Sequence, residues 1–119
     1  MRKNNEIAPY LPLTPALFHV LLALADGDKH GYAILKEVSK RTDDKVRLST
    51  GTLYGIIKRL LEEEMIEESA RRPASSLDDE RRRYYRLTAF GRQVAQAEAQ
   101  RLEEILLMAR AKKLLRAEA

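Results

Sequence analysis

Cysteine and tryptophan are absent from the 119 residues of this sequence, and aromatic residues make up only 6% of it. Without cysteine, the chain can form no disulfide, no thiolate zinc site and no thiol nucleophile. Its two histidines, His19 and His30, do not stand at the spacing of metal ligands. We expect a core or interface role for His19 and a bond to a backbone group at a helix start for His30. We predict no metal site and no cofactor.

Long apolar runs are missing as well. The first residues, MRKNNEIAPYLPL, include basic side chains but no continuous apolar stretch of signal-peptide length, and no later run approaches a membrane span. A cytoplasmic protein without a membrane partner is therefore expected. A catalytic constellation is also missing, because no nucleophile is paired with a base and the consecutive glutamates Glu62, Glu63 and Glu64 point to different sides of a helix. We predict no catalytic residues and no enzyme.

The residues that are present describe a globular chain. Hydrophobic residues make up 45% of it and charged residues 34%, and its length suits one domain with an appended helix. The formal net charge of +4 permits a polyanionic partner, although so modest an excess decides little by itself. The placement of the charges along the chain is more informative.

Apolar residues at helical spacing predict three helices in the first half of the chain. The predicted ranges are 14–25, 30–41 and 49–64. Thr14, followed by a proline at the first helical position, and Ser49 are the expected N-caps of the first and third helices. The short run 46–48 between the second and third helices can pair as a minimal strand or simply lie extended.

The pattern changes after the third helix. Residues 65–72 and 81–88 suit two antiparallel strands joined by a polar loop, and Thr88 can cap a last helix that runs to the C-terminus. The fold class predicted is mainly α with a small β-hairpin: a winged helix-turn-helix domain with a long C-terminal dimerisation helix. The expected division is an N-terminal arm or irregular lead-in over 1–12, the winged domain over 13–88 and the dimerisation helix over 89–119.

Small and basic residues gather where a winged helix meets double-stranded DNA, since its third helix enters the major groove. The outward side of that helix carries Gly51, Gly55 and Lys58, beside Thr52 and Arg59. A helical glycine costs about 1 kcal/mol relative to alanine, so two glycines on one exposed side favour close approach to a DNA backbone. Hydroxyls near the helix start can donate to phosphates, and the arginines before the second strand can neutralise phosphates from the wing.

Three segments resemble the PadR family of winged-helix transcriptional regulators. They are His30–Ile34 (HGYAI), Ser49–Tyr54 (STGTLY) and Arg82–Gly91 (RRYYRLTAFG). The resemblance implies a dimeric regulator, usually a repressor, whose C-terminal helix supplies the dimer contact. It also implies that Tyr32 and Tyr54 face DNA. The chain departs from the family in two places, with Glu64 where glycine usually ends the third helix and Gly55 where many relatives have proline. We expect the helix before Glu64 to end by a different geometry, because a left-handed non-glycine residue is costly.

We therefore expect a sequence-specific DNA-binding regulator that binds an inverted-repeat operator as a homodimer. The predicted DNA-binding residues are Tyr32, Ser49, Thr50, Gly51, Thr52, Tyr54, Lys58, Arg59, Arg81, Arg82 and Arg83. The predicted dimerisation residues are Leu102, Ile105, Leu106 and Ala109.

Several alternatives remain open at this level. The winged helix can instead be a protein-interaction module whose basic surface binds an acidic partner. The two tyrosines can be packing residues, and the arginine run 81–83 can be an edge that discourages strand pairing. Whether a small hydrophobic effector releases the protein from DNA is also open, because no aromatic residue follows Phe90 in the last helix to stack on a ligand.

Overall fold

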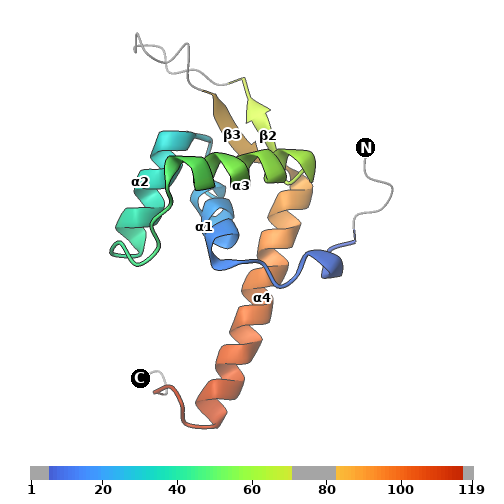
Figure 1. Ribbon diagram of the computed structural model, residues 1–119. Coiled ribbons are helices and arrows are strands. Elements are labelled where there is room, and N and C mark those ends of the chain that lie inside the picture. Colours follow the sequence, from blue (N-terminus) through green and yellow to red (C-terminus); the bar gives the residue numbers. More distant parts are fainter. Residues whose placement is uncertain (1–5, 71–82, 117–119) are drawn as a thin grey trace.

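The structure, a computed structural model, describes residues 6–70 and 83–116 (Figure 1). In chain order the elements are η1 (Ala8–Tyr10), α1 (Pro15–Leu24), β1 (Lys29–His30), α2 (Gly31–Arg41), α3 (Thr50–Glu62), β2 (Ile66–Ser69), β3 (Tyr84–Leu87) and α4 (Ala89–Ala111). The predicted order of three helices, a hairpin and a long helix is confirmed. In Figure 1, α2 and α3 lie around α1, and α4 runs away from this body toward the C-terminus.

Side-chain caps start all four α-helices of the described chain. In each helix the cap accepts a hydrogen bond of 2.9–3.2 Å from the backbone N–H three residues later. The caps are Thr14, His30, Ser49 and Thr88. The hydroxyl caps are confirmed, as is the backbone bond expected of His30, which accepts through Nδ1. Local chemistry is therefore sufficient to set where each helix begins.

The small sheet has the strand order β1-β3-β2, and both pairings are antiparallel. The β2–β3 hairpin was predicted, and its register pairs Ile66 with Leu87 and Ser69 with Tyr84. The third strand, β1, was not predicted, because two residues are too short to show an alternating pattern. The run 46–48 forms no strand and lies in irregular chain before α3. One of the two outer strands of this sheet thus comes from the residues just before α2.

The hydrophobic core surrounds α1. Its deeply buried members include Val20, Leu21 and Leu24 from α1, Ile34 and Val38 from α2, Leu53, Ile57 and Leu60 from α3, and Val94 from α4. Each helix of the winged domain contributes its predicted apolar stripe to this core. The opposite side of α3 consequently faces solvent.

The chain before α1 packs against the core from residue 7 onward, as a short irregular lead-in with one 3-10 turn. The Tyr10 ring meets Phe90 edge to face at 5.6 Å, and its hydroxyl donates a 2.9 Å hydrogen bond to Glu63. The buried carboxylate of Glu98 in α4 accepts the backbone N–H of Leu13 and two hydrogen bonds, of 2.7 and 2.8 Å, from Arg101. This lead-in therefore joins the end of α3 to α4.

Two helix ends differ from expectation. Glu64 does adopt the left-handed conformation, with φ 61°, and Met65 N–H donates to the Leu60 carbonyl at 2.9 Å. This is the usual glycine-type helix end, so the expected different geometry is wrong. The last helix ends at Ala111 and does not run to the C-terminus, because Lys113 turns left-handed with φ 64°.

Candidate nucleic-acid interface

The outer face of α3 collects most of the predicted DNA-binding residues. Eight positions from the N-cap through the middle of the helix are exposed, while Leu53, Ile57 and Leu60 are buried beneath them. The exposed residues are Ser49, Thr50, Gly51, Thr52, Tyr54, Gly55, Lys58 and Arg59. The packing of α3 thus presents these side chains together on one solvent-facing surface.

Neither glycine of this surface is required by the fold. A β-carbon built on Gly51 or on Gly55 would meet no heavy atom within 4 Å. Alanine at either position would favour the helix by about 1 kcal/mol. The two glycines leave the backbone of α3 accessible to an incoming partner.

The hydroxyls at the start of α3 have unequal roles. Ser49 caps the helix and also donates a 2.9 Å hydrogen bond to the Thr52 hydroxyl. Its single hydroxyl hydrogen is therefore used within the protein, whereas Thr52 accepts this bond and keeps its own hydrogen to donate. Thr52 is thus better suited than Ser49 to donate to a phosphate or a base.

The two predicted tyrosines lie where α2 begins. Tyr32 is 57% exposed, and its ring stacks on His30 at 6.5 Å while the Lys36 ammonium lies 5.4 Å from its centroid. Tyr54 is 47% exposed and reaches across from α3 to Gly31. Burial raises the pKa of Tyr85 in β3 above its ordinary value of 10.0, and the charge of Tyr54 adds to this rise. Tyr54 thus extends from α3 to the first residue of α2.

Basic residues at the base of the wing are paired with glutamates of the neighbouring strand. Arg83 lies 3.1 Å from Glu68, and Arg86 lies 2.9 Å from Glu67. All four side chains are exposed, so these ion pairs are weak and a phosphate can compete for the arginines. The predicted wing residues Arg81 and Arg82 lie outside the described residues.

A basic face on α2 was missed in the sequence. Lys36 and Lys40 are exposed and, with Glu37 and Arg41, line an open hollow of about 660 Å³. Their four-residue spacing places the two lysines on one side of the helix, and this signal could have revealed the surface. The first helix of a helix-turn-helix crosses the DNA backbone, so this face extends the candidate interface.

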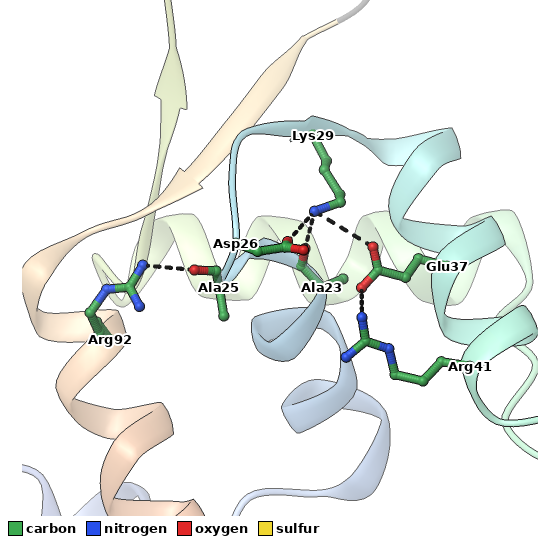
Figure 2. A network of polar contacts seen from close by, with 7 residues as sticks. All are labelled: Ala23, Ala25, Asp26, Lys29, Glu37, Arg41 and Arg92. Carbon is green, nitrogen blue, oxygen red and sulfur yellow. Dashed lines mark hydrogen bonds and ion pairs between the residues drawn. The ribbon is translucent and has the colours of Figure 1, made fainter.

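A polar network holds α2 beside α1 (Figure 2). The Lys29 ammonium donates to the Ala23 carbonyl at 2.6 Å and to Asp26 at 2.5 Å, and it lies 3.5 Å from Glu37. Glu37 in turn binds Arg41 at 2.6 Å. The hydrogen bond from Lys29 holds the pKa of Asp26 below its ordinary value. The network fixes α2 relative to the end of α1.

The predicted dimerisation residues lie in the projecting half of α4. Ile105 and Leu106 are about half exposed, and Leu102 and Ala109 are partly buried. Further large apolar residues exposed in or just after this helix were not predicted to belong to the surface: Leu107, Met108, Leu114 and Leu115. The end of the described chain thus exposes a large amount of apolar surface.

Neither a metal site nor a membrane span stands out in the described part of the chain. Over 6–70 and 83–116, no group of three or more potential ligands could hold a metal ion. No helix in these ranges has the length and apolar character needed to cross a bilayer.

Comparison with known proteins identifies the family. The model of the transcriptional regulator PadR-like family matches residues 20–97, which include α2, α3 and both strands of the hairpin. The chain belongs to this family. An uncharacterized protein X from Lysinibacillus sphaericus is 33% identical to this chain over 73 residues. The match spans 61% of this chain and 64% of that protein, which is less than two thirds of the relative.

Solved structures share the fold of this PadR-like protein. A transcriptional regulator from Clostridium thermocellum is 26% identical with a TM-score of 0.61, covering 93% of this chain and 97% of that one. A PadR family transcription regulator from Clostridium difficile is 25% identical with a TM-score of 0.66, covering 80% and 94%. Bacillus subtilis PadR, solved in complex with operator DNA, is 20% identical with a TM-score of 0.59, covering 71% and 46%.

Proposed function

We propose that this PadR-like protein is a sequence-specific DNA-binding regulator, acting as a repressor on an inverted-repeat operator. The observation that carries the proposal is the outer face of α3, where two glycines that the fold does not need stand among exposed hydroxyl and basic side chains. Such a face suits close approach to a DNA backbone and donation to phosphates and base edges. Because its partner is genomic DNA, we place the protein in the cytoplasm.

Selection of bound fragments from random DNA, followed by footprinting, tests this proposal. We expect enrichment of one inverted repeat, and an affinity that falls steeply with salt because phosphate contacts release counterions. If no fragment is enriched over competitor at moderate salt, the regulator interpretation fails. Salt-insensitive binding to an acidic protein would then favour the alternative, a winged-helix interaction module.

Substitutions can separate the contacts that position the protein on the DNA backbone from the contacts that recognise the base sequence. Arg83→Ala should weaken binding to all DNA about equally and lower the salt slope by about 1, because a phosphate contact carries no sequence information. Thr52→Ala and Lys58→Ala should instead change the preference between related sites. An Arg83→Ala protein with unchanged affinity and salt slope would contradict the placement of the wing on DNA.

We further propose that the apolar surface of α4 is the contact between two copies of the chain. Ile105 and Leu106 are exposed in one chain, and burying such a side chain contributes about 1.5–3 kcal/mol. Leu106→Glu in the full chain should give monomers that bind a half-site normally and the full operator weakly. Glu103→Gln, an exposed change on the same helix, is the control. A Leu106→Glu protein that sediments as a dimer would place the contact elsewhere.

A further inference from the structure

The two helices of the helix-turn-helix unit meet at Gly31 and Tyr54. Gly31 is the first residue of α2 and is buried, whereas Tyr54 belongs to the exposed face of α3. A β-carbon built on Gly31 would lie 2.4 Å from the Tyr54 hydroxyl oxygen and 2.8 Å from the ring carbon that bears it. Both distances are shorter than a van der Waals contact. The tyrosine therefore occupies the space that any side chain at position 31 would fill.

The contact covers only one end of the tyrosine. Tyr54 is 47% exposed although its hydroxyl end lies on Gly31, so a large part of the residue still faces solvent. An exposed tyrosine on a helix samples several rotamers, whereas a side chain seated against a neighbouring backbone is held in one. The seat at Gly31 thus orders a side chain within the surface that we propose to bind DNA.

The residues around the contact between Gly31 and Tyr54 belong to the surface that we propose to bind DNA. Tyr32, which follows Gly31, is exposed beside Lys36, and Thr50 and Gly51 lie one helical turn before Tyr54 on α3. Through its contact with Gly31, Tyr54 reaches from α3 to the start of α2. A tyrosine held in this position offers the exposed part of its ring beside the starts of both helices, which we propose to face phosphates.

We propose that Gly31 is a positioning residue for DNA binding, whose missing side chain seats Tyr54 in its DNA-binding orientation. This inference rests on the proposed function. Its physical basis is preorganisation: a side chain ordered before binding does not have to be ordered during it. Losing the order of one such side chain weakens binding by about three- to tenfold.

A double-mutant cycle with the full-length protein tests the inference. Gly31→Ala, Tyr54→Ala and the double variant are compared with the wild type by fluorescence anisotropy on the DNA fragment that the wild type selects. We expect Gly31→Ala to fold, because the obstructing atoms belong to the outer end of a half-exposed side chain that can swing away. Its affinity should fall about three- to tenfold. The double variant should bind no more weakly than Tyr54→Ala alone, because Gly31 affects binding only through the position of the Tyr54 side chain.

Thermal unfolding of each variant separates positioning from a loss of structure. If Gly31→Ala is destabilised by the tyrosine ring, the double variant should recover the melting temperature of Tyr54→Ala. Wild-type affinity in Gly31→Ala, or losses that add in the double variant, would overturn the inference. These outcomes differ from failure of the proposed function, in which the wild type itself selects no DNA.

Discussion

Gly55→Ala should make the protein more stable and bind DNA more weakly. The substitution adds one methyl group on the outer face of α3, and no heavy atom of the described chain lies within 4 Å of the new β-carbon. The helix gains through lower backbone entropy in the unfolded chain, by about 1 kcal/mol. For a domain of this size that gain raises the melting temperature by about 4 °C.

The effect on DNA binding has the opposite sign. If the backbone of α3 approaches DNA closely at Gly55, the methyl group keeps the two surfaces apart and lengthens the neighbouring hydrogen bonds. We expect at least a tenfold loss of affinity, which corresponds to about 1.4 kcal/mol. The trade of stability against function is the pattern expected where a residue is kept for binding.

Two assays on one preparation decide the matter. Thermal unfolding followed by circular dichroism measures the gain in stability. Fluorescence anisotropy with the selected DNA fragment measures the loss of DNA affinity. Gln96→Ala, an exposed change on α4 outside the candidate interface, is the control and should leave affinity unchanged. A Gly55→Ala protein that is stabilised but binds DNA as tightly as the wild type would refute close approach at this position.

Three further substitutions test the fold. Gly91→Ala should destabilise the protein by about 3 kcal/mol, because its β-carbon would lie 1.8 Å from the backbone oxygen of Met65, which cannot swing aside; a melting temperature near that of the wild type would contradict this contact. Glu64→Gly should stabilise by about 1 kcal/mol in urea unfolding because φ is 61°, and Glu64→Ala, which keeps the strain, should bring no such gain. The hydrogen bond from Arg101 holds the pKa of Glu98 below its ordinary value of 4.5, so the native state favours the carboxylate. The ionised carboxylate therefore adds to the free energy of unfolding in full above that value, and this stabilisation is lost as the pH falls through the lower pKa of the folded state. The difference in stability between the wild type and Glu98→Gln should narrow over this acid range. A gap that stays constant from neutral pH into this acid range would argue against that role of Glu98.

Sequence-local signals predicted most of the fold correctly. The caps Thr14, Ser49 and Thr88 and the apolar stripes of the helices were readable, because a cap needs only its own helix and a stripe needs only helical periodicity. The exposed α3 face followed from the same periodicity. The predicted roles of these exposed residues in DNA binding, and of α4 in dimerisation, stay predictions.

Apart from the end of α4, which follows from the local turn at Lys113, the errors occur where two distant segments determine the outcome. Strand β1 exists because Lys29 and His30 pair with the far edge of β3, and two residues carry no periodic signal of their own. Glu64 was expected to avoid a left-handed conformation, but Thr88 N–H donates to the Met65 carbonyl and the Thr88 hydroxyl to the Glu64 carbonyl, and these bonds hold the turn. Tertiary hydrogen bonds thus overcame a local cost of about 1 kcal/mol.

The sequence by itself determined the helices, the hairpin and the family, because these depend on spacing and composition within short segments. Only the tertiary structure decided which residues of different segments act together. It joined Tyr10 to Glu63 and Leu13 to Glu98, and it seated Tyr54 on Gly31. Such contacts depend on how whole elements cross, and the crossing is set by the packed core rather than by any residue's neighbours in the chain.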